Sequence, residues 1–184
     1  YTTVLSGVQH VASHAQGEPW QTIGYDRYLG DAHEAEKRAV EFLENAPEQP
    51  FFLSVGFVDT HREFEPRNGL DDPRYCRPPD PLPDTPETRR DMAEFVASAR
   101  ILDGCYGQVL DALDRAGLSE NTLVICTTDH GIAFPGMKCN LTDHGIGVML
   151  IVRGPGGFVG GRVVDAMVSH IDLFPTLCDL LEIE

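Results

Sequence analysis

An aspartate and a histidine stand side by side at the end of an apolar run, where their types and position could carry chemistry. Asp129 and His130 close a predicted buried strand over residues 122–128. In open α/β sheets, ligands bind at the carboxyl ends of the strands. A carboxylate and an imidazole are a pair of metal ligands, and Gly131 lets the backbone turn away at once. The pattern predicts a metal site and favours a metal-dependent hydrolase.

Two further side chains could act beside such a site. His61 comes shortly after the apolar strand predicted over residues 51–57, and Lys138 lies in the loop that follows Gly131. A metal polarises an ester oxygen, while an imidazole and an ammonium group bind the remaining oxygens of an oxyanion or protonate a leaving group. The combination suits hydrolysis of a sulfate or phosphate ester.

Each of these residues also has a simpler interpretation. Taken alone, His61 could be a packed or solvent-facing residue, and Lys138 a solvated loop charge. Residues 129–131 could form a turn stabilised by the aspartate side chain. His144 could be a further ligand, but it stands in a predicted loop and we interpret it as surface.

Composition limits the classes of partner. The 184 residues suffice for one domain with a core, and they carry a formal net charge of -15 from 29 acidic and 14 basic side chains. Such a surface repels nucleic acid and anionic lipid, so we expect neither as a partner. No apolar run is long enough to span a membrane. The five cysteines show no Cys-x-x-Cys spacing, so neither a zinc knuckle nor a disulfide framework is predicted.

Strands and helices alternate along the chain, which predicts an α/β fold with a mostly parallel sheet in three α/β/α layers. Asp31 is a suitable N-cap for a helix that runs to residue 44, with Glu34 completing a capping box. Thr85 opens a second, long helix that Gly117 ends. The other expected elements are strands at residues 2–5, 51–57, 122–128, 148–152 and 163–168, a last helix beginning at Asp172, and loops over residues 13–30 and 59–86.

Five segments of the chain resemble, in the same order, blocks of the type I sulfatases of the alkaline phosphatase superfamily. The segments are residues 3–10, 49–61, 123–131, 150–156 and 168–176. Residues 129–135 are most similar to the branch that contains heparan N-sulfatase. The resemblance implies an alkaline phosphatase-like fold and hydrolysis of a sulfate ester or sulfamate on a small molecule or a saccharide.

The resemblance also implies roles for individual residues. Asp129 and His130 would bind a divalent metal, commonly calcium in this family. Manganese is an alternative, because an imidazole is a softer ligand than an amide. His61 would contact the sulfate and the leaving-group oxygen. Lys138 matches a sulfate-binding lysine or arginine, and His10 matches the histidine of the family's Gly-Lys-Trp-His block.

Two departures from the family pattern affect the expected activity. Val8 stands where the family has a lysine. The family's formylglycine nucleophile comes from the cysteine of a Cys-x-Pro-x-Arg segment that precedes the histidine block. Cys76 begins a Cys-Arg-Pro-Pro-Asp sequence, which has Asp80 in place of the arginine and follows His10, so we interpret Cys76 as a loop residue.

We therefore interpret residues 1–184 as a single partial sulfatase catalytic domain. The resemblance implies that the formylglycine, two further metal carboxylates and a C-terminal subdomain lie outside these residues, and we expect little or no turnover from this chain alone. Two alternatives stay open: a phosphodiesterase or phosphonate monoester hydrolase of the same superfamily, and a non-catalytic sulfatase-like binding protein. The sequence does not determine the substrate, the oligomeric state or the compartment.

Overall fold

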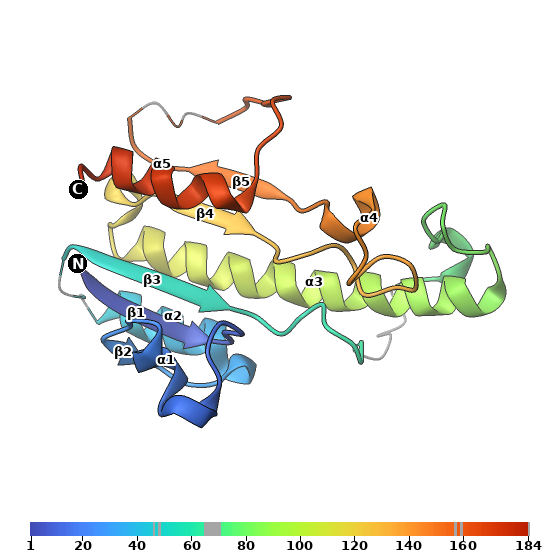
Figure 1. Cartoon of the computed structure of the whole chain (residues 1–184), viewed down its shortest axis with the longest axis horizontal. Helices are drawn as coiled ribbons and strands as arrows, with labels where there is room; N and C mark the ends of the chain where they lie inside the picture. The colour runs from blue at the N-terminus through green and yellow to red at the C-terminus, as the bar shows by residue number, and fades with distance from the viewer. Residues whose placement is uncertain (46, 48, 65–70, 157, 159, 184) are drawn as a thin grey trace.

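Three strands near the start of the chain form a parallel sheet (Figure 1). The structure is a computed structural model that describes residues 1–45, 47, 49–64, 71–156, 158 and 160–183. β1 (Thr2–Gly7) pairs in parallel with β3 (Phe51–Gly56) and with the short β2 (Arg27–Tyr28), in the order β2-β1-β3. β1 and β3 pair along their whole lengths and end at the same edge. The segments that carry His10 and His61 leave the sheet from that edge.

The later part of the chain adds a second pair of strands, which is antiparallel. β4 (Val124–Thr127) pairs with β5 (Leu150–Arg153). A parallel connection needs a crossover of a dozen or more residues, usually a helix. The connection here contains only the one-turn helix α4 (Asp143–Ile146) among its helices, which is too short to carry the chain back along a strand. The prediction of an α/β fold with a mostly parallel sheet is confirmed, and β4 and β5 form a separate two-stranded antiparallel sheet.

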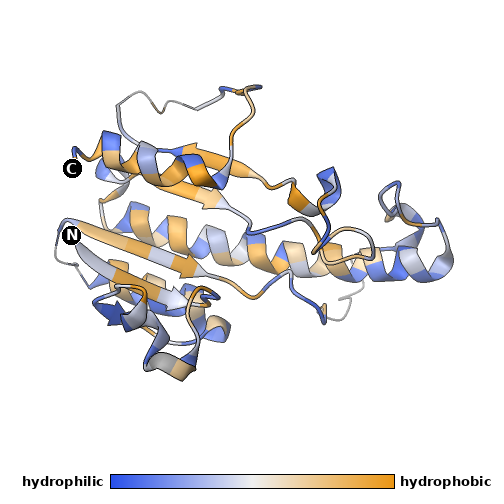
Figure 2. Cartoon of the chain, viewed as in Figure 1, coloured by the Kyte–Doolittle hydropathy of each residue, from blue (hydrophilic) through white to orange (hydrophobic). Residues whose placement is uncertain are grey.

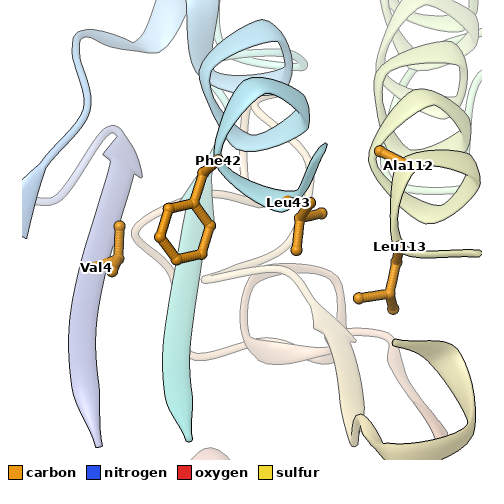
Figure 3. Packing of buried hydrophobic residues seen from close by; sticks show 5 residues of the cluster. All are labelled: Val4, Phe42, Leu43, Ala112 and Leu113. Atoms are coloured by element: carbon orange, nitrogen blue, oxygen red, sulfur yellow. The ribbon is translucent and has the colours of Figure 1, made fainter. Parts of the chain in front are cut away.

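Two long helices enclose the core. α2 (Ala35–Glu44) packs on β1 and β3, and α3 (Pro86–Arg115) packs on α2. Figure 2 shows apolar residues along β3, β4 and β5, whereas the first turns of α3 are polar. Side chains from β1, α2 and α3 meet in the buried cluster of Figure 3, which consists of Val4, Phe42, Leu43, Ala112 and Leu113.

The predicted limits of the long helices follow from their caps. The Thr85 hydroxyl accepts from the Thr88 N–H at 3.3 Å, the Thr88 hydroxyl accepts from the Thr85 N–H at 3.0 Å, and Gly117 has φ +70° just after α3. Asp31 caps the 3-10 turn that leads into α2, by accepting from the His33 backbone N–H at 3.0 Å. The predicted capping role of Glu34 is wrong, because its carboxylate pairs with Arg38 at 2.8 Å and the first turn is the 3-10 helix η2 (Ala32–Glu34).

Residues 13–30 contain more structure than the predicted loop. They form η1 (His14–Gln16), α1 (Pro19–Thr22) and β2. The Asp26 carboxylate, just before β2, accepts from both the N–H and the hydroxyl of Thr3 at 2.8 Å. This contact joins residues 23 positions apart, so local sequence patterns do not reveal it.

The strand predicted over residues 163–168 is wrong. The segment has no strand pairing in the part of the chain that the structure describes, and Val163 and Met167 are 88% and 100% exposed. A single extended segment without a neighbour leaves its backbone groups unpaired, so β-rich composition alone does not make a strand.

The remaining elements complete the chain. They are η3 (Pro73–Tyr75), η4 (Ser119–Asn121), η5 (His170–Asp172) and α5 (Leu173–Leu180). α5 confirms the predicted last helix. Of the predicted 59–86 loop, residues 65–70 lie outside the described residues. Among the helices that are described, none combines the length and apolar character needed to cross a bilayer.

Candidate functional site

Asp129 and His130 come directly after β4, at its carboxyl end. Oδ1 of Asp129 accepts from the His130 backbone N–H at 3.0 Å, and Oδ2 lies 3.3 Å from His130 Nε2. The Asp129 side chain is 80% exposed and the His130 side chain 34% exposed. The carboxylate and the imidazole therefore face each other at an accessible strand end, as the sequence predicts.

A hydrogen bond at Nδ1 of His130 determines which of the two ring nitrogens could bind a metal. Nδ1 lies 2.7 Å from the carbonyl oxygen of Gly131, and a carbonyl can only accept. Nδ1 thus carries a hydrogen, so Nε2, which lies beside the Asp129 carboxylate, is the nitrogen whose lone pair a neutral ring would offer to a metal. A backbone carbonyl that holds a histidine in this tautomer is a common arrangement around metal-ligating imidazoles.

The separation of the two electron-rich atoms fits a shared cation. Neighbouring ligands at right angles on a divalent cation lie about 2.9–3.5 Å apart for the usual metal–nitrogen and metal–oxygen bond lengths. Asp129 Oδ2 and His130 Nε2 are 3.3 Å apart. No group of three or more His, Cys, Asp or Glu residues suited to a metal occurs within the described residues. Among the described residues, Asp129 and His130 are therefore a pair of candidate ligands and not a closed cage.

Gly131 permits a close approach by α4. Its N–H donates to the Gly145 carbonyl at 2.9 Å, and a Cβ at position 131 would lie 1.8 Å from the His144 carbonyl oxygen. The glycine is therefore required by the neighbouring turn as well as by the chain reversal. His144 itself is exposed, as predicted, but on the short helix α4 rather than in a loop.

Two side-chain contacts hold β4 in place behind the site. Tyr106 of α3 lies beside Cys126 of β4, and burial together with its interaction with the Cys126 side chain raises the pKa of Tyr106. The Thr127 hydroxyl donates to the Met149 carbonyl at 2.7 Å, so it accepts from His170 Nε2 at 2.8 Å. The strand that ends in Asp129 is thereby fixed to α3, to the approach to β5 and to η5.

His61 and Lys138 lie on two loops that contact each other. Arg62, next to His61, donates from Nε to the Ala133 carbonyl at 2.7 Å. His61 is exposed, and Lys138 is half-buried with its backbone N–H bonded to the Ile132 carbonyl at 3.3 Å. The structure brings the two loops together, and the roles of His61 and Lys138 stay predictions.

His10 leaves the sheet beside the loop of His61. The Val8 N–H donates to the Gly56 carbonyl at 2.9 Å, and a Cβ on Gly56 would lie 2.1 Å from the Val8 carbonyl oxygen. The Gln9 side chain stabilises the following turn by accepting from two backbone N–H groups at 2.8 and 2.9 Å. His10 is exposed on this turn, and its role stays a prediction.

Cys76 lies on a separate segment near the start of α3. It follows η3, which packs on α3, and the Arg89 side chain of α3 donates to the Arg74 carbonyl at 2.7 Å. The placement agrees with the interpretation of Cys76 as a loop residue.

Sequence patterns did not reveal the residues that join the two site loops. Arg62 bonds with Asp91 on α3, and the rings of Phe64, Phe95 and Phe134 pack together. The Asp91 carboxylate raises the pKa of Arg62. The only local sign of this contact in the sequence was the presence of Phe64 and Phe134 in otherwise polar loops.

A comparison with known families decides the class of protein. A model of the Sulfatase family matches residues 8–183, which is nearly the whole chain. This chain belongs to the sulfatase family. The resemblance seen in the five sequence segments is confirmed.

Known sulfatases cover the chain in sequence and in structure. Human N-sulphoglucosamine sulphohydrolase is 33% identical over 168 residues, which cover 78% of this chain and 34% of the human protein. The structure of BT33494S-sulf, described under the metabolism of multiple glycosaminoglycans by Bacteroides thetaiotaomicron, has a TM-score of 0.61 at 26% identity and covers 82% of this chain and 35% of that one. The chain spans about a third of the length of the curated relatives it matches.

A further solved structure supports the fold alone. Ps i-CgsB in complex with k-i-k-neocarrahexaose has a TM-score of 0.72 and covers 100% of this chain and 51% of that one, at 18% identity. The fold of this chain is therefore that of the sulfatases, with an alkaline phosphatase-like architecture.

Proposed function

We propose that this chain is part of a sulfatase that hydrolyses a sulfuric ester or sulfamate with the help of a divalent cation. The observation that carries the proposal is the geometry at the end of β4. In a chain of the sulfatase family, His130 presents the lone pair of Nε2 to the side of the Asp129 carboxylate, at 3.3 Å from Oδ2.

Each residue has a definite part in this proposal. Asp129 and His130 hold the cation, which when bound supplies Lewis-acid stabilisation of the charge on the sulfate oxygens. The Lys138 ammonium binds a sulfate oxygen, and His61 contacts the sulfate and protonates the leaving oxygen or nitrogen. His10 contributes a further hydrogen-bonding group from the end of β1. Because the chain is strongly acidic, an anionic substrate depends on these local positive groups.

The nucleophile is proposed to lie outside these 184 residues. In this proposal a formylglycine outside these residues would supply the nucleophile for the sulfate sulfur, while His61 would protonate the leaving oxygen or nitrogen as its bond to sulfur breaks. Residues 1–184 act as one part of the catalytic domain, which agrees with their spanning about a third of the matched relatives. Without that segment we expect the chain to bind the cation and not to turn over a substrate.

A saccharide is the proposed carrier of the sulfate. The human relative is named for N-sulphoglucosamine, and BT33494S-sulf is described under glycosaminoglycan metabolism. Calcium is the proposed cation because carboxylate oxygens suit it, and manganese is the alternative because it accepts an imidazole more readily.

Hydrolysis assays test the proposed reaction. We expect the protein that contains this chain together with a formylglycine segment to release sulfate from an aryl sulfate and from a sulfated glucosamine. We expect the isolated chain to release none. Faster release of phosphate from an aryl phosphate diester or an aryl phosphonate ester would favour the phosphate-hydrolase alternative. No release from any of these substrates would favour a binding protein.

Manganese binding tests the proposed ligands without any turnover. Mn²⁺ added to the isotope-labelled chain is expected to broaden the amide signals of residues 128–131 first, because a paramagnetic ion relaxes nearby nuclei. Asp129→Ala should weaken this binding by about tenfold or more, since it removes one of two protein ligands. Asp143→Ala is the matched control, because Asp143 is also exposed and lies on nearby α4. Equal broadening in both variants would contradict the assignment.

A further inference from the structure

Arg62 connects three separate parts of the chain. Its Nε donates to the Ala133 carbonyl at 2.7 Å, on the loop that follows β4. Its Nη1 and Nη2 donate to the two carboxylate oxygens of Asp91 on α3, at 2.9 and 2.5 Å. The guanidinium thus holds the loop after β3, the loop after β4 and α3 in one arrangement. Two parallel bonds from a planar guanidinium to a carboxylate constrain direction as well as distance.

Aromatic rings cover the same guanidinium. Its Cζ lies 4.4 Å from the centroid of the Phe64 ring and 4.9 Å from that of Phe134. The two rings and Phe95 of α3 lie 5.5–5.7 Å apart, centroid to centroid. Phe134 is only 4% exposed. The cation therefore sits against a packed aromatic cluster, where cation–π attraction adds to the hydrogen bonds.

These contacts leave Arg62 poorly suited to bind a substrate anion. Each of its three nitrogens already donates to a protein oxygen, and Asp91 balances its charge. Of its neighbours, His61 is exposed and Lys138, four residues after Phe134, is half-buried.

We propose that Arg62 is a positioning residue that sets the loop of His61 against the loop of Lys138. The proposal rests on the proposed function in that it assigns substrate contacts to those two residues. In this arrangement a single side chain determines whether the imidazole and the ammonium can act on one sulfate group. Loss of its fork of hydrogen bonds frees both loops together, although they are 71 residues apart along the chain at the Arg62–Ala133 bond.

Amide hydrogen exchange in the full chain tests the coupling directly. We expect Arg62→Lys to speed exchange of the His61, Met137 and Asn140 amides by about tenfold or more, because lysine cannot make the bidentate bond and the carbonyl bond at once. Amides of β1 should keep their wild-type exchange rates, since β1 is not one of the segments that Arg62 holds together. Phe64→Tyr, which keeps the ring face, should leave all these rates within about twofold of wild type.

Arg89→Lys is the matched control. Arg89 also pairs with an aspartate, Asp84, and donates to a backbone carbonyl at 2.7 Å, but it holds the segment of η3 instead of the site loops. We expect this variant to leave exchange at His61 and Met137 unchanged. The proposal is overturned if Arg62→Lys leaves the two site loops at wild-type rates. It is also overturned if exchange rises equally in β1, which would indicate general destabilisation.

A titration with inorganic sulfate distinguishes a failure of this proposal from a failure of the proposed function. In the presence of Ca²⁺, which is diamagnetic and leaves nearby signals sharp, sulfate should shift the signals of the His61 ring and the Lys138 amide in wild type and Arg89→Lys, and shift them less in Arg62→Lys. Absence of a shift in the wild-type chain counts against sulfate binding at this site, and the exchange rates then decide whether Arg62 couples the loops. Equal shifts in all three proteins would overturn the positioning role.

Discussion

Gly131→Ala is expected to destabilise the chain by about 2–3 kcal/mol and to displace α4 from the end of β4. A methyl group at this position would lie 1.8 Å from the His144 carbonyl oxygen and 2.7 Å from its carbonyl carbon. Both are backbone atoms, so the collision cannot be relieved by rotating a side chain. The shift would also break the bond from the Gly131 N–H to the Gly145 carbonyl. Urea denaturation measures the loss, and Mn²⁺ broadening at residues 128–131 reports the damage to the site.

Gly104→Ala is the control for this substitution. Gly104 lies within α3, and a Cβ there would meet no atom within 4 Å. We expect that variant to gain about 0.5–1 kcal/mol, because alanine favours the helix and restricts the unfolded chain. Wild-type stability and wild-type Mn²⁺ broadening in Gly131→Ala would contradict the close approach of α4.

Leu43→Ala is expected to lower the free energy of unfolding by about 2–5 kcal/mol. Leu43 is 1% exposed, and it belongs to the cluster that joins β1, α2 and α3. Truncation removes buried methyl groups and leaves a cavity that the surrounding backbone can close only in part. In a chain of this size the melting temperature should fall by roughly 5–15 °C, which calorimetry or circular dichroism can measure.

Leu141→Ala is the matched control for the core. It makes the same chemical change at a residue that is 93% exposed, so we expect a change within about 0.5 kcal/mol. A similar loss of stability in both variants would mean that the buried cluster around Leu43 in Figure 3 is not the centre of the fold.

The two substitutions probe different parts of the molecule. The core determines whether the strands and helices assemble, while the turn at Gly131 determines how the end of β4 is presented. Leu43→Ala should therefore lower stability and leave Mn²⁺ binding intact under conditions where the variant is folded. Gly131→Ala should impair both.

The amino-acid sequence determined the parts of the protein that depend on neighbouring residues. Thr85 and Gly117 mark the ends of α3 because capping and left-handed backbone are local effects. Asp129 and His130 follow a strand because the apolar run before them is long enough to be one. The family resemblance added the sulfatase assignment, which the family match confirms.

Only the tertiary structure decided the features that join distant residues. Asp26 holds β2 to β1 across 23 positions, and Arg62 joins the two site loops across 71. The segment at residues 163–168 has β-rich composition, yet it makes no strand among the described residues because pairing requires a neighbour in space. Local patterns determine where helices end and which segments are strands, whereas strand pairing and side-chain bridges arise when the folded chain brings separated residues together.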